Sequence, residues 1–269
     1  MSTTAVVSPT MPTLFDSETA PRLTADHITR LAAGAVGSVR IPDFFGVEEC
    51  MEIMRALESC EMGSYDEQLV QPRIAKLGPA AYDFYGDGGL LPEYWEHAAQ
   101  STASRSTLLF GNDPLHTALG LIEDAWGDRV QPATSDGRPM FAGMIREINN
   151  GARMHFDEVI REFKGVLDQQ PIGQIAFNCH LSTGLEGGEA VAHRRRWAPS
   201  DENHRDGYGY DPALVAGEPA ASVRADLGDA VFFDPRNYHQ VRPVLGGGRR
   251  VTLSFFIGVT ARGPLLVWS

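Results

Sequence analysis

Two histidines and one aspartate have the spacing of a metal centre. His155 and Asp157 are separated by one residue, and in a strand residues i and i+2 point to the same face, with Cα atoms about 6.5 Å apart. Two such side chains can converge on one ion, and a third ligand must then come from a distant strand. Two histidines and a carboxylate on one face are the ligand set of non-haem iron sites that keep positions open. His239 is the candidate third ligand.

A second pair with the same spacing, His204 and Asp206, competes for this role. It lies in the polar segment DENHRDG, which has no strand pattern, whereas His155 follows an apolar stretch and a turn. His155 precedes His239 by 84 residues (239 − 155), which leaves room for the intervening strands of a barrel, while His204 precedes it by only 35 (239 − 204). His155 and Asp157 are therefore preferred.

A strand that follows His239 carries a candidate anion-binding residue. Residues 250–257 alternate between an aliphatic and aromatic face suited to packing against helices and a more polar face suited to a pocket. A guanidinium on the polar face is the natural partner of a carboxylate, which it binds through two parallel hydrogen bonds. This alternation favours Arg250 over the neighbouring Arg249, whose alternative role is that of a solvated surface arginine.

The elements that must position these residues are expected to be mainly helices in the N-terminal half of the chain and short strands in the C-terminal half. Helices are expected at residues 23–33, with Thr24 as N-cap, at 47–57 and from 114 to about 126, a strand at 38–41, and an ordered loop at 78–91. From residue 138 onward, short apolar runs recur between Gly, Asn, Asp and Pro clusters, which is typical of an antiparallel sandwich or barrel. The expected division is a disordered tail at 1–22, an α-rich support at 23–137 and a β-rich core at 138–261, packed as one unit.

Composition limits the classes of partner. The 269 residues carry a net charge of −12, which argues against nucleic acid or an anionic membrane surface. No run approaches the ~18 apolar residues of a membrane helix, and the first residues lack the regions of a signal peptide. The three cysteines match no disulfide or zinc spacing. A cytoplasmic protein with a small-molecule substrate is expected.

The chain resembles the iron(II)/2-oxoglutarate-dependent oxygenases, in their prolyl-hydroxylase-like branch. Within that branch it is most similar to bacterial N-acyl amino-acid hydroxylases and to stand-alone alkaloid halogenases, over roughly residues 38–260. The resemblance is carried by IPDFFGVEEC at 41–50, HFD at 155–157, GGE at 187–189 and GDAVFFDPRNYHQVRPVLGGGRR at 228–250.

The resemblance implies a mainly β fold, a double-stranded β-helix (jelly roll, cupin-like) with supporting helices. It also implies that His155, Asp157 and His239 hold Fe(II), that 2-oxoglutarate chelates the metal, and that its distal carboxylate pairs with Arg250 or Arg249. With O2, an unactivated C–H bond of a small molecule would be hydroxylated, releasing succinate and CO2.

Family halogenases carry Gly or Ala where this chain has Asp157, so the resemblance favours hydroxylation. Desaturation, cyclisation or halogenation on the same scaffold, or a non-redox cupin-like metalloenzyme, are the alternatives.

Substrate-binding residues are expected in two places. Three consecutive arginines, Arg194, Arg195 and Arg196, lie in a long polar insertion that can cover the cavity mouth as a lid, and one of them can pair with a substrate carboxylate. The alternative is a solvated basic turn balanced by nearby acidic residues. Tyr82 and Phe84 are candidates to line the pocket, with core packing as the alternative.

Overall fold

The structure is a computed structural model that describes residues 15–86, 89–261 and 263–269. Of the predicted disordered tail, residues 1–14 lie outside the described residues. The part that is described differs from the expectation, because Ser17–Thr19 form β1, which pairs in parallel with β2 (Ser38–Ile41). The tail prediction failed there because three polar residues gain their strand conformation from the partner strand and not from their own pattern.

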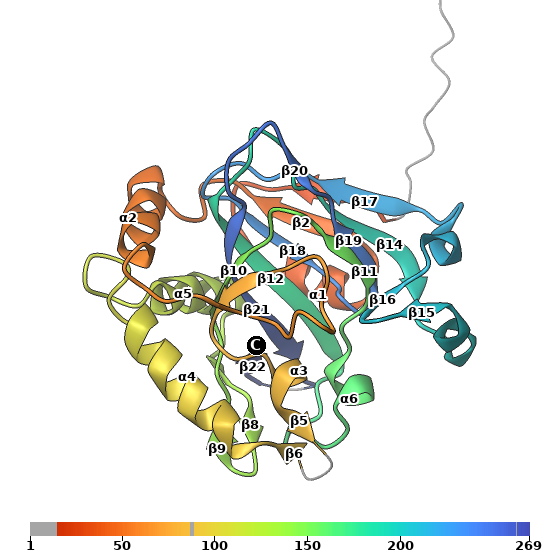
Figure 1. The fold of residues 1–269 in the computed structure, drawn as a ribbon, viewed down its shortest axis with the longest axis horizontal. Coiled ribbons are helices and arrows are strands. Elements are labelled where there is room, and N and C mark those ends of the chain that lie inside the picture. The colour runs from red at the N-terminus through yellow and green to blue at the C-terminus, as the bar shows by residue number, and fades with distance from the viewer. Residues whose placement is uncertain (1–14, 87–88, 262) are drawn as a thin grey trace, which may run out of the picture.

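The chain folds into two antiparallel-rich sheets (Figure 1). Residues of both sheets line one cavity. The short strands that were predicted for the C-terminal part of the chain lie in both sheets. The large sheet has the order β1-β2-β18-β12-β21-β10-β4-β3, and β22 joins β21 to β7. Its further strands are β18 (Ala230–Phe233), β12 (Gly173–Ser182), β21 (Val251–Val259), β10 (Met144–Glu147), β4 (Ala75–Leu77), β3 (Gly63–Ser64), β22 (Leu265–Trp268) and β7 (Val130–Pro132).

The small sheet has the order β11-β19-β14-β17 and carries the two histidines of the predicted metal site. Its strands are β11 (Ala152–His155), β19 (Asn237–Val241), β14 (Ala190–Arg196) and β17 (Ala220–Val223). Four two-stranded ribbons complete the strands: β13 (Glu186–Gly187) with β20 (Val244–Leu245), β15 (Arg205–Asp206) with β16 (Gly209–Tyr210), β5 (Tyr85–Gly86) with β6 (Gly89–Leu90), and β8 (Thr134–Ser135) with β9 (Arg138–Pro139).

The outer face of the large sheet is covered by helices, and β21 shows how its two faces differ. Val251, Leu253 and Ile257 are fully buried in the main hydrophobic core, as the alternating pattern predicted. The ring of Phe255 joins them, 4.5 Å from that of Phe177 on β12. This face supports β21 from behind, so the polar residues of the same strand point into the cavity. The covering helices are α1 (Ala25–Ala32), α2 (Val47–Leu57), α4 (Pro92–Arg105) and α5 (Pro114–Trp126), with short turns α3 (Ala81–Phe84), α6 (Val159–Glu162), Pro199–His204 and Pro212–Val215 elsewhere.

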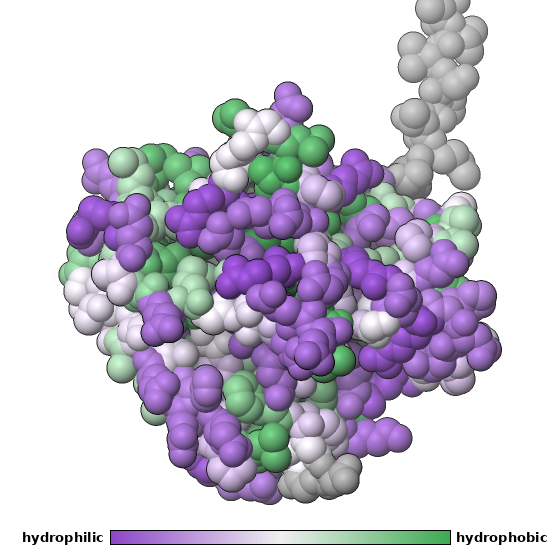
Figure 2. Space-filling model, viewed as in Figure 1, coloured by the Kyte–Doolittle hydropathy of each residue, from purple (hydrophilic) through white to green (hydrophobic). Residues whose placement is uncertain are grey.

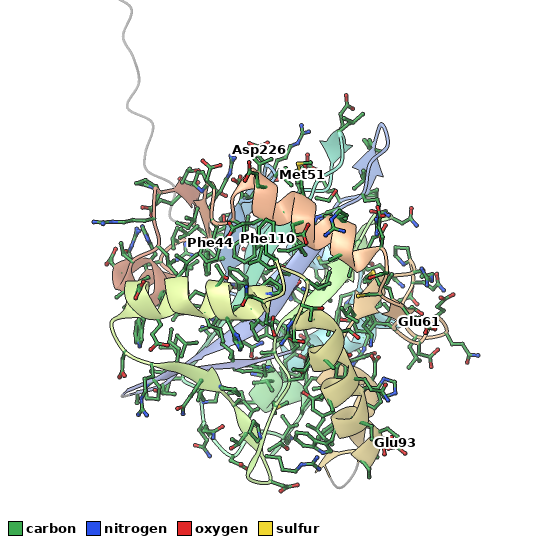
Figure 3. The ribbon with its side chains drawn as sticks, turned by 90° about the vertical axis from the view of Figure 1, so that its left-hand side faces the viewer. Phe44, Met51, Glu61, Glu93, Phe110 and Asp226 are labelled. Atoms are coloured by element: carbon green, nitrogen blue, oxygen red, sulfur yellow. The ribbon has the colours of Figure 1, made fainter. Side chains whose placement is uncertain are left out.

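Three helices confirm the sequence prediction, and two segments correct it. Helix α1 begins at the predicted N-cap, Thr24, whose side chain accepts a hydrogen bond from the His27 amide. Helix α2 has the predicted bounds. It buries Cys50, Ile53 and Leu57, while Val47 and Met51 are 53% and 64% exposed. Met51 is labelled in Figure 3. The expected loop at 78–91 contains α3, and α4 was not predicted, since it buries only Tyr94 and Arg105 and has no continuous apolar stripe.

A buried ion pair ties α4 and α5 to the start of β10. The Arg105 guanidinium donates to both carboxylate oxygens of Asp113, at 2.8 and 3.0 Å, and also to the backbone carbonyls of Ala142 and Gly143. Asp113 in turn caps α5 by accepting the Leu115 amide. Residue 143 must be glycine, because its φ is +84° and a Cβ would lie 2.9 Å from the guanidinium. The pair therefore fixes where β10 enters the sheet.

The surface is mostly hydrophilic on the face seen in Figure 2, with a small hydrophobic area at the tip near β20. Leu185 and Leu245 are exposed there. In the described part of the chain, no helix combines the length and apolar character needed to cross a membrane.

Candidate active site

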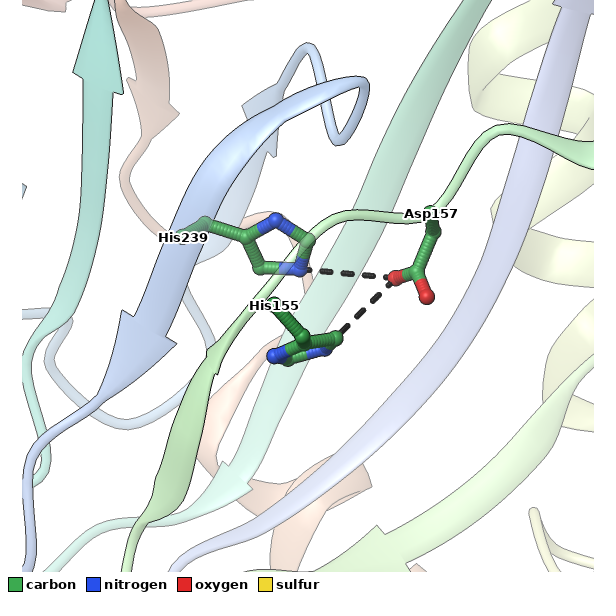
Figure 4. Close-up of side chains that lie close together, drawn as sticks. All are labelled: His155, Asp157 and His239. Atoms are coloured by element: carbon green, nitrogen blue, oxygen red, sulfur yellow. Dashed lines mark ion pairs between the residues drawn. The ribbon is translucent and has the colours of Figure 1, made fainter. Parts of the chain in front are cut away.

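The predicted metal-binding side chains converge where β11 and β19 meet (Figure 4). His155 and His239 are register partners across this antiparallel pair. Asp157 follows β11 by two residues, and its amide donates to the Pro235 carbonyl at 2.9 Å, which holds the segment against the turn before β19. One ligand atom from each of the three side chains lies within 4.8 Å of the others.

The hydrogen bonds of the two imidazoles leave the correct nitrogens free for a metal. His155 Nδ1 lies 2.7 Å from the Arg153 carbonyl and His239 Nδ1 lies 3.0 Å from the Asn237 carbonyl. Each Nδ1–H therefore donates, and each Nε2 presents its lone pair toward Asp157 Oδ2, at 3.7 and 3.4 Å.

Charge and burial prepare the same three groups for coordination. Burial, with the neighbouring His239, lowers the pKa of His155 to about 4, so the imidazole is neutral. Burial acts to raise the pKa of Asp157, but the two imidazoles outweigh it and bring the pKa to about 2. Two imidazole nitrogens and a carboxylate on one face are a donor set that fits Fe(II).

The cavity in front of these side chains is walled by both sheets, by α3 and α6, and by residues 205–210 of the long polar insertion. Its polar groups come from different elements, and most of the remaining wall is aliphatic or aromatic. The polar and aromatic lining includes Tyr65, Tyr82, Arg146, Glu162, Gln174, Asn178, Arg205, Tyr208, Tyr210, Gln240, Arg250, Ser254, Phe256 and Trp268.

Arg250 lies in this cavity with one donor group unused. Its side chain is 3% exposed, Nε donates to the Gly188 carbonyl at 3.0 Å, and Nη2 lies 3.3 Å from His180 Nε2. Burial and the Arg250 charge lower the pKa of His180 to about 3, so that nitrogen accepts. Nη1 is buried and has no hydrogen-bond partner in the described residues. Burial, with Arg146, lowers the pKa of Arg250 to about 9. A buried cation with a free donor fits a carboxylate of 2-oxoglutarate.

Arg249 has a different environment. Its guanidinium donates to both oxygens of Glu147, at 3.0 and 2.7 Å, and its side chain is 44% exposed. It does not line the cavity. The alternation of β21 thus separates the two arginines as the sequence pattern favoured.

Of the two aromatic residues predicted to line the pocket, the structure places only one in the cavity. Tyr82 lines the cavity, whereas Phe84 does not and packs against Tyr94 and His97 with ring centroids 6.0 and 5.2 Å away.

None of the three consecutive arginines lines the cavity. Arg195 pairs with Asp201 at 2.7 Å, Arg196 pairs with Asp234 at 2.6 Å, and Arg194 is exposed. The reason is that β14 runs on through these residues beside β19, which turns them toward solvent and toward residues 199–204. The insertion reaches the cavity instead through Arg205, Tyr208 and Tyr210. His204, the alternative candidate for a metal ligand, is exposed.

Sequence reasoning missed several charged residues of the cavity, among them Arg146 and Glu162. Arg146 on β10 donates to Ser254 Oγ and to Asn178 Oδ1, both at 3.2 Å. The i, i+2 spacing of Met144, Arg146 and Ile148, all of which face the cavity, is the signal that could have found it. Glu162 was also missed. Burial, together with the charge of Asp157, raises its pKa to about 8.

Comparison with known proteins places the chain. No family model matches it. L-gamma-glutamyl-L-propargylglycine hydroxylase of Streptantibioticus cattleyicolor is 40% identical over 258 residues, which cover 95% of this chain and 96% of the relative. A novel N-substituted L-amino acid dioxygenase of Burkholderia ambifaria has a similar structure, with a TM-score of 0.59, 16% identity and 92% of each chain covered. A 2OG-Fe(II) oxygenase family oxidoreductase of Burkholderia pseudomallei has a TM-score of 0.51 and 16% identity, covering 93% of this chain and 100% of its own.

These comparisons and the geometry agree. The identity to a hydroxylase extends over almost the whole of both chains, and the solved structures share the jelly-roll fold that was predicted and is confirmed. The iron and 2-oxoglutarate dependence predicted from the motifs is confirmed as well. The chain belongs to the iron(II)- and 2-oxoglutarate-dependent oxygenases and is a hydroxylase of that family.

Proposed function

We propose that this enzyme hydroxylates an unactivated C–H bond of an amino-acid-derived small molecule. The observation that carries the proposal is the 40% identity, over nearly its full length, to an enzyme whose name gives a γ-glutamyl amino acid as substrate. The fold neighbour acts on N-substituted L-amino acids, which is the same chemical class. A cavity that combines charged groups with aromatic walls suits such a substrate.

In this proposal, His155, Asp157 and His239 hold the iron, and Arg250 holds the distal carboxylate of 2-oxoglutarate. When bound, the metal and its cosubstrate supply oxygen activation and the oxidising power for C–H cleavage. The protein keeps both Nε2 atoms unprotonated through the backbone carbonyls that accept from Nδ1. Asp157 adds an anionic donor at the position that family halogenases leave open for a halide, which supports hydroxylation.

We further propose that the enzyme works in the cytoplasm without a nucleic-acid partner. Its three cysteines are all free thiols, which suits a reducing compartment. Its net charge of −12 opposes binding to phosphate backbones.

The test is turnover of a substrate panel by protein loaded with Fe(II) under 2-oxoglutarate and O2. The panel contains γ-glutamyl dipeptides, N-acyl amino acids, free amino acids and small alcohols without an amino-acid moiety. We expect at least one amino-acid derivative to stimulate succinate release and to gain one oxygen atom by mass spectrometry. Stimulation by the alcohols alone, or by nothing in the panel although 2-oxoglutarate binds, would contradict the proposed substrate class.

A pair of histidine variants tests the metal assignment. His155→Ala should lose Fe(II) binding in an anaerobic titration, whereas His204→Ala is the matched control, because His204 belongs to the exposed pair of the same spacing. Equal iron binding by the two variants would refute the assignment.

A further inference from the structure

Arg146 has no part in the proposed function, although it faces the same cavity as the metal-binding side chains. Its Nε donates to Ser254 and its Nη2 to Asn178, and both partners are neutral. Ser254 and Asn178 are themselves buried. These two bonds orient the guanidinium, which has five N–H donors in all. They do not balance its charge.

The three cavity arginines differ in their partners. Arg205 pairs with Glu202 at 3.5 Å. Among the described residues, neither Arg146 nor Arg250 has a carboxylate at ion-pair distance. A partly buried cation without a counter-ion is costly unless a ligand supplies one. Arg250 is accounted for by the distal carboxylate of 2-oxoglutarate in the proposed function. Arg146 therefore calls for a second carboxylate.

The register places Arg146 on the cavity face of the large sheet. It is the cross-strand partner of Thr252 on β21, and Ser254, to which it donates, is the next residue along the same cavity face. Arg146 lines the same cavity as His155, Asp157 and His239. A carboxylate held by Arg146 would thus lie in the cavity that holds the metal-binding side chains.

We propose that Arg146 binds a second carboxylate in the cavity, in addition to the one held by Arg250. This inference rests on the proposed function, since two sources offer such a group: the metal-binding end of 2-oxoglutarate and the carboxylate of an amino-acid-derived substrate. The chemistry at Arg146 is the same for both, a guanidinium–carboxylate pair prearranged by Ser254 and Asn178.

The test is ligand binding to protein loaded with Mn(II) in place of iron, without oxygen, measured by calorimetry. Arg146→Gln removes the charge, Arg146→Lys restores it in part, and Arg249→Gln is the matched control, an arginine that pairs with Glu147 outside the cavity. The ligands are 2-oxoglutarate, then acetate and a γ-glutamyl dipeptide added to the 2-oxoglutarate complex. The dipeptide is also tested as its diamide, in which the glutamyl α-carboxylate and the C-terminal carboxylate are both amides.

Two results support the proposal and identify the source. If the cosubstrate supplies the carboxylate, the Kd of 2-oxoglutarate rises about 10- to 100-fold in Arg146→Gln. If the substrate supplies it, 2-oxoglutarate binds normally, while the Kd values of acetate and the free dipeptide rise by this factor and that of the diamide does not. In either case Arg146→Lys should recover part of the affinity, which a merely structural role would not produce.

The proposal is overturned if 2-oxoglutarate, acetate and dipeptide all bind to a folded Arg146→Gln protein as they bind to the wild type. Failure of the wild type to bind any dipeptide would instead count against the proposed substrate class, and the 2-oxoglutarate and acetate measurements would still decide the role of Arg146. Circular dichroism and Mn(II) affinity establish that each variant is folded and loaded.

Discussion

Replacing Arg250 with methionine should separate binding of the cosubstrate from stability of the fold. Methionine fills much of the space of the arginine stem but carries no charge and no donor. In the wild type, Nε and Nη2 are occupied by Gly188 and His180, and Nη1 is the buried donor left for a ligand. The substitution removes that donor together with the Arg250 charge.

The expected loss of affinity follows from the burial of Arg250, which is 3% exposed. Removing one partner of a buried, hydrogen-bonded charge pair costs about 2–5 kcal/mol. With about 1.4 kcal/mol per tenfold change, the Kd of 2-oxoglutarate should rise about 30- to 3,000-fold. Calorimetry on anaerobic, Mn(II)-loaded protein measures this directly.

Without 2-oxoglutarate, the same substitution should not destabilise the protein. Arg250 is then a buried cation without a counter-ion, which its lowered pKa of about 9 reflects, and replacing such a charge by an apolar side chain is often neutral or stabilising. The melting temperature of the ligand-free variant should equal or exceed that of the wild type.

Arg249→Met is the control for both measurements. Its ion pair with Glu147 is half exposed and contributes about 0–1 kcal/mol, and the Kd of 2-oxoglutarate should stay within about twofold of the wild-type value. The reasoning is refuted if Arg249→Met loses affinity and Arg250→Met does not.

Three further predictions concern buried groups elsewhere. Asp113→Ala leaves the Arg105 charge unpaired and uncaps α5, so calorimetry should show a loss of about 3–5 kcal/mol and a melting temperature lower by roughly 6–15 °C; a decrease under about 2 °C would contradict this. The raised pKa of Glu162, about 8, means that this carboxyl lowers the stability of the folded metal-free protein as pH rises from 5 to 8 and it must ionise. The lowered pKa values of His155 and His180 act in the opposite direction in the lower part of this range, so the comparison with Glu162→Gln isolates the contribution of Glu162. The melting temperature of the wild type relative to that of Glu162→Gln should decrease from pH 5 to pH 8, and a constant difference would argue against the assignment. Burial raises the pKa of Cys50 to about 11 and that of Cys179 well above its ordinary value, so iodoacetamide at pH 8 should modify neither in the native protein, and mass spectrometry showing either adduct would contradict it.

The features that could be predicted from the sequence are those that depend on local periodicity. The i, i+2 spacing of His155 and Asp157 and the alternation that separates Arg250 from Arg249 depend only on the strand repeat, and the fold follows both. The start of α1 was likewise predictable, because Thr24 caps it through bonds to a residue three positions away.

What the sequence could not predict depends on partners far along the chain. Arg146 becomes a cavity residue only because β10 lies beside β21, which places it opposite Thr252. Helix α2 has two stripes at helical spacing, and contact with β12, where the Cys50 thiol lies near the His180 carbonyl, decides which one is buried. The sequence shows that Arg194, Arg195 and Arg196 form a basic cluster. It does not show that β14 continues through this cluster and turns it away from the cavity.

The charges of the cavity bear on what binds at Arg146. At neutral pH Glu162 is mostly protonated, and His155 is neutral. Arg205 and Glu158, which also line the cavity, are balanced by their ion-pair partners Glu202 and Arg161. Arg146, Arg250 and Asp157 then leave one positive charge, to which Fe(II) adds two. A dianionic 2-oxoglutarate neutralises two of these three charges, and the third favours an anionic group on the substrate. A substrate with a free carboxylate satisfies this balance, whereas its amide does not, so the charge balance favours the substrate over the cosubstrate as the source of the second carboxylate.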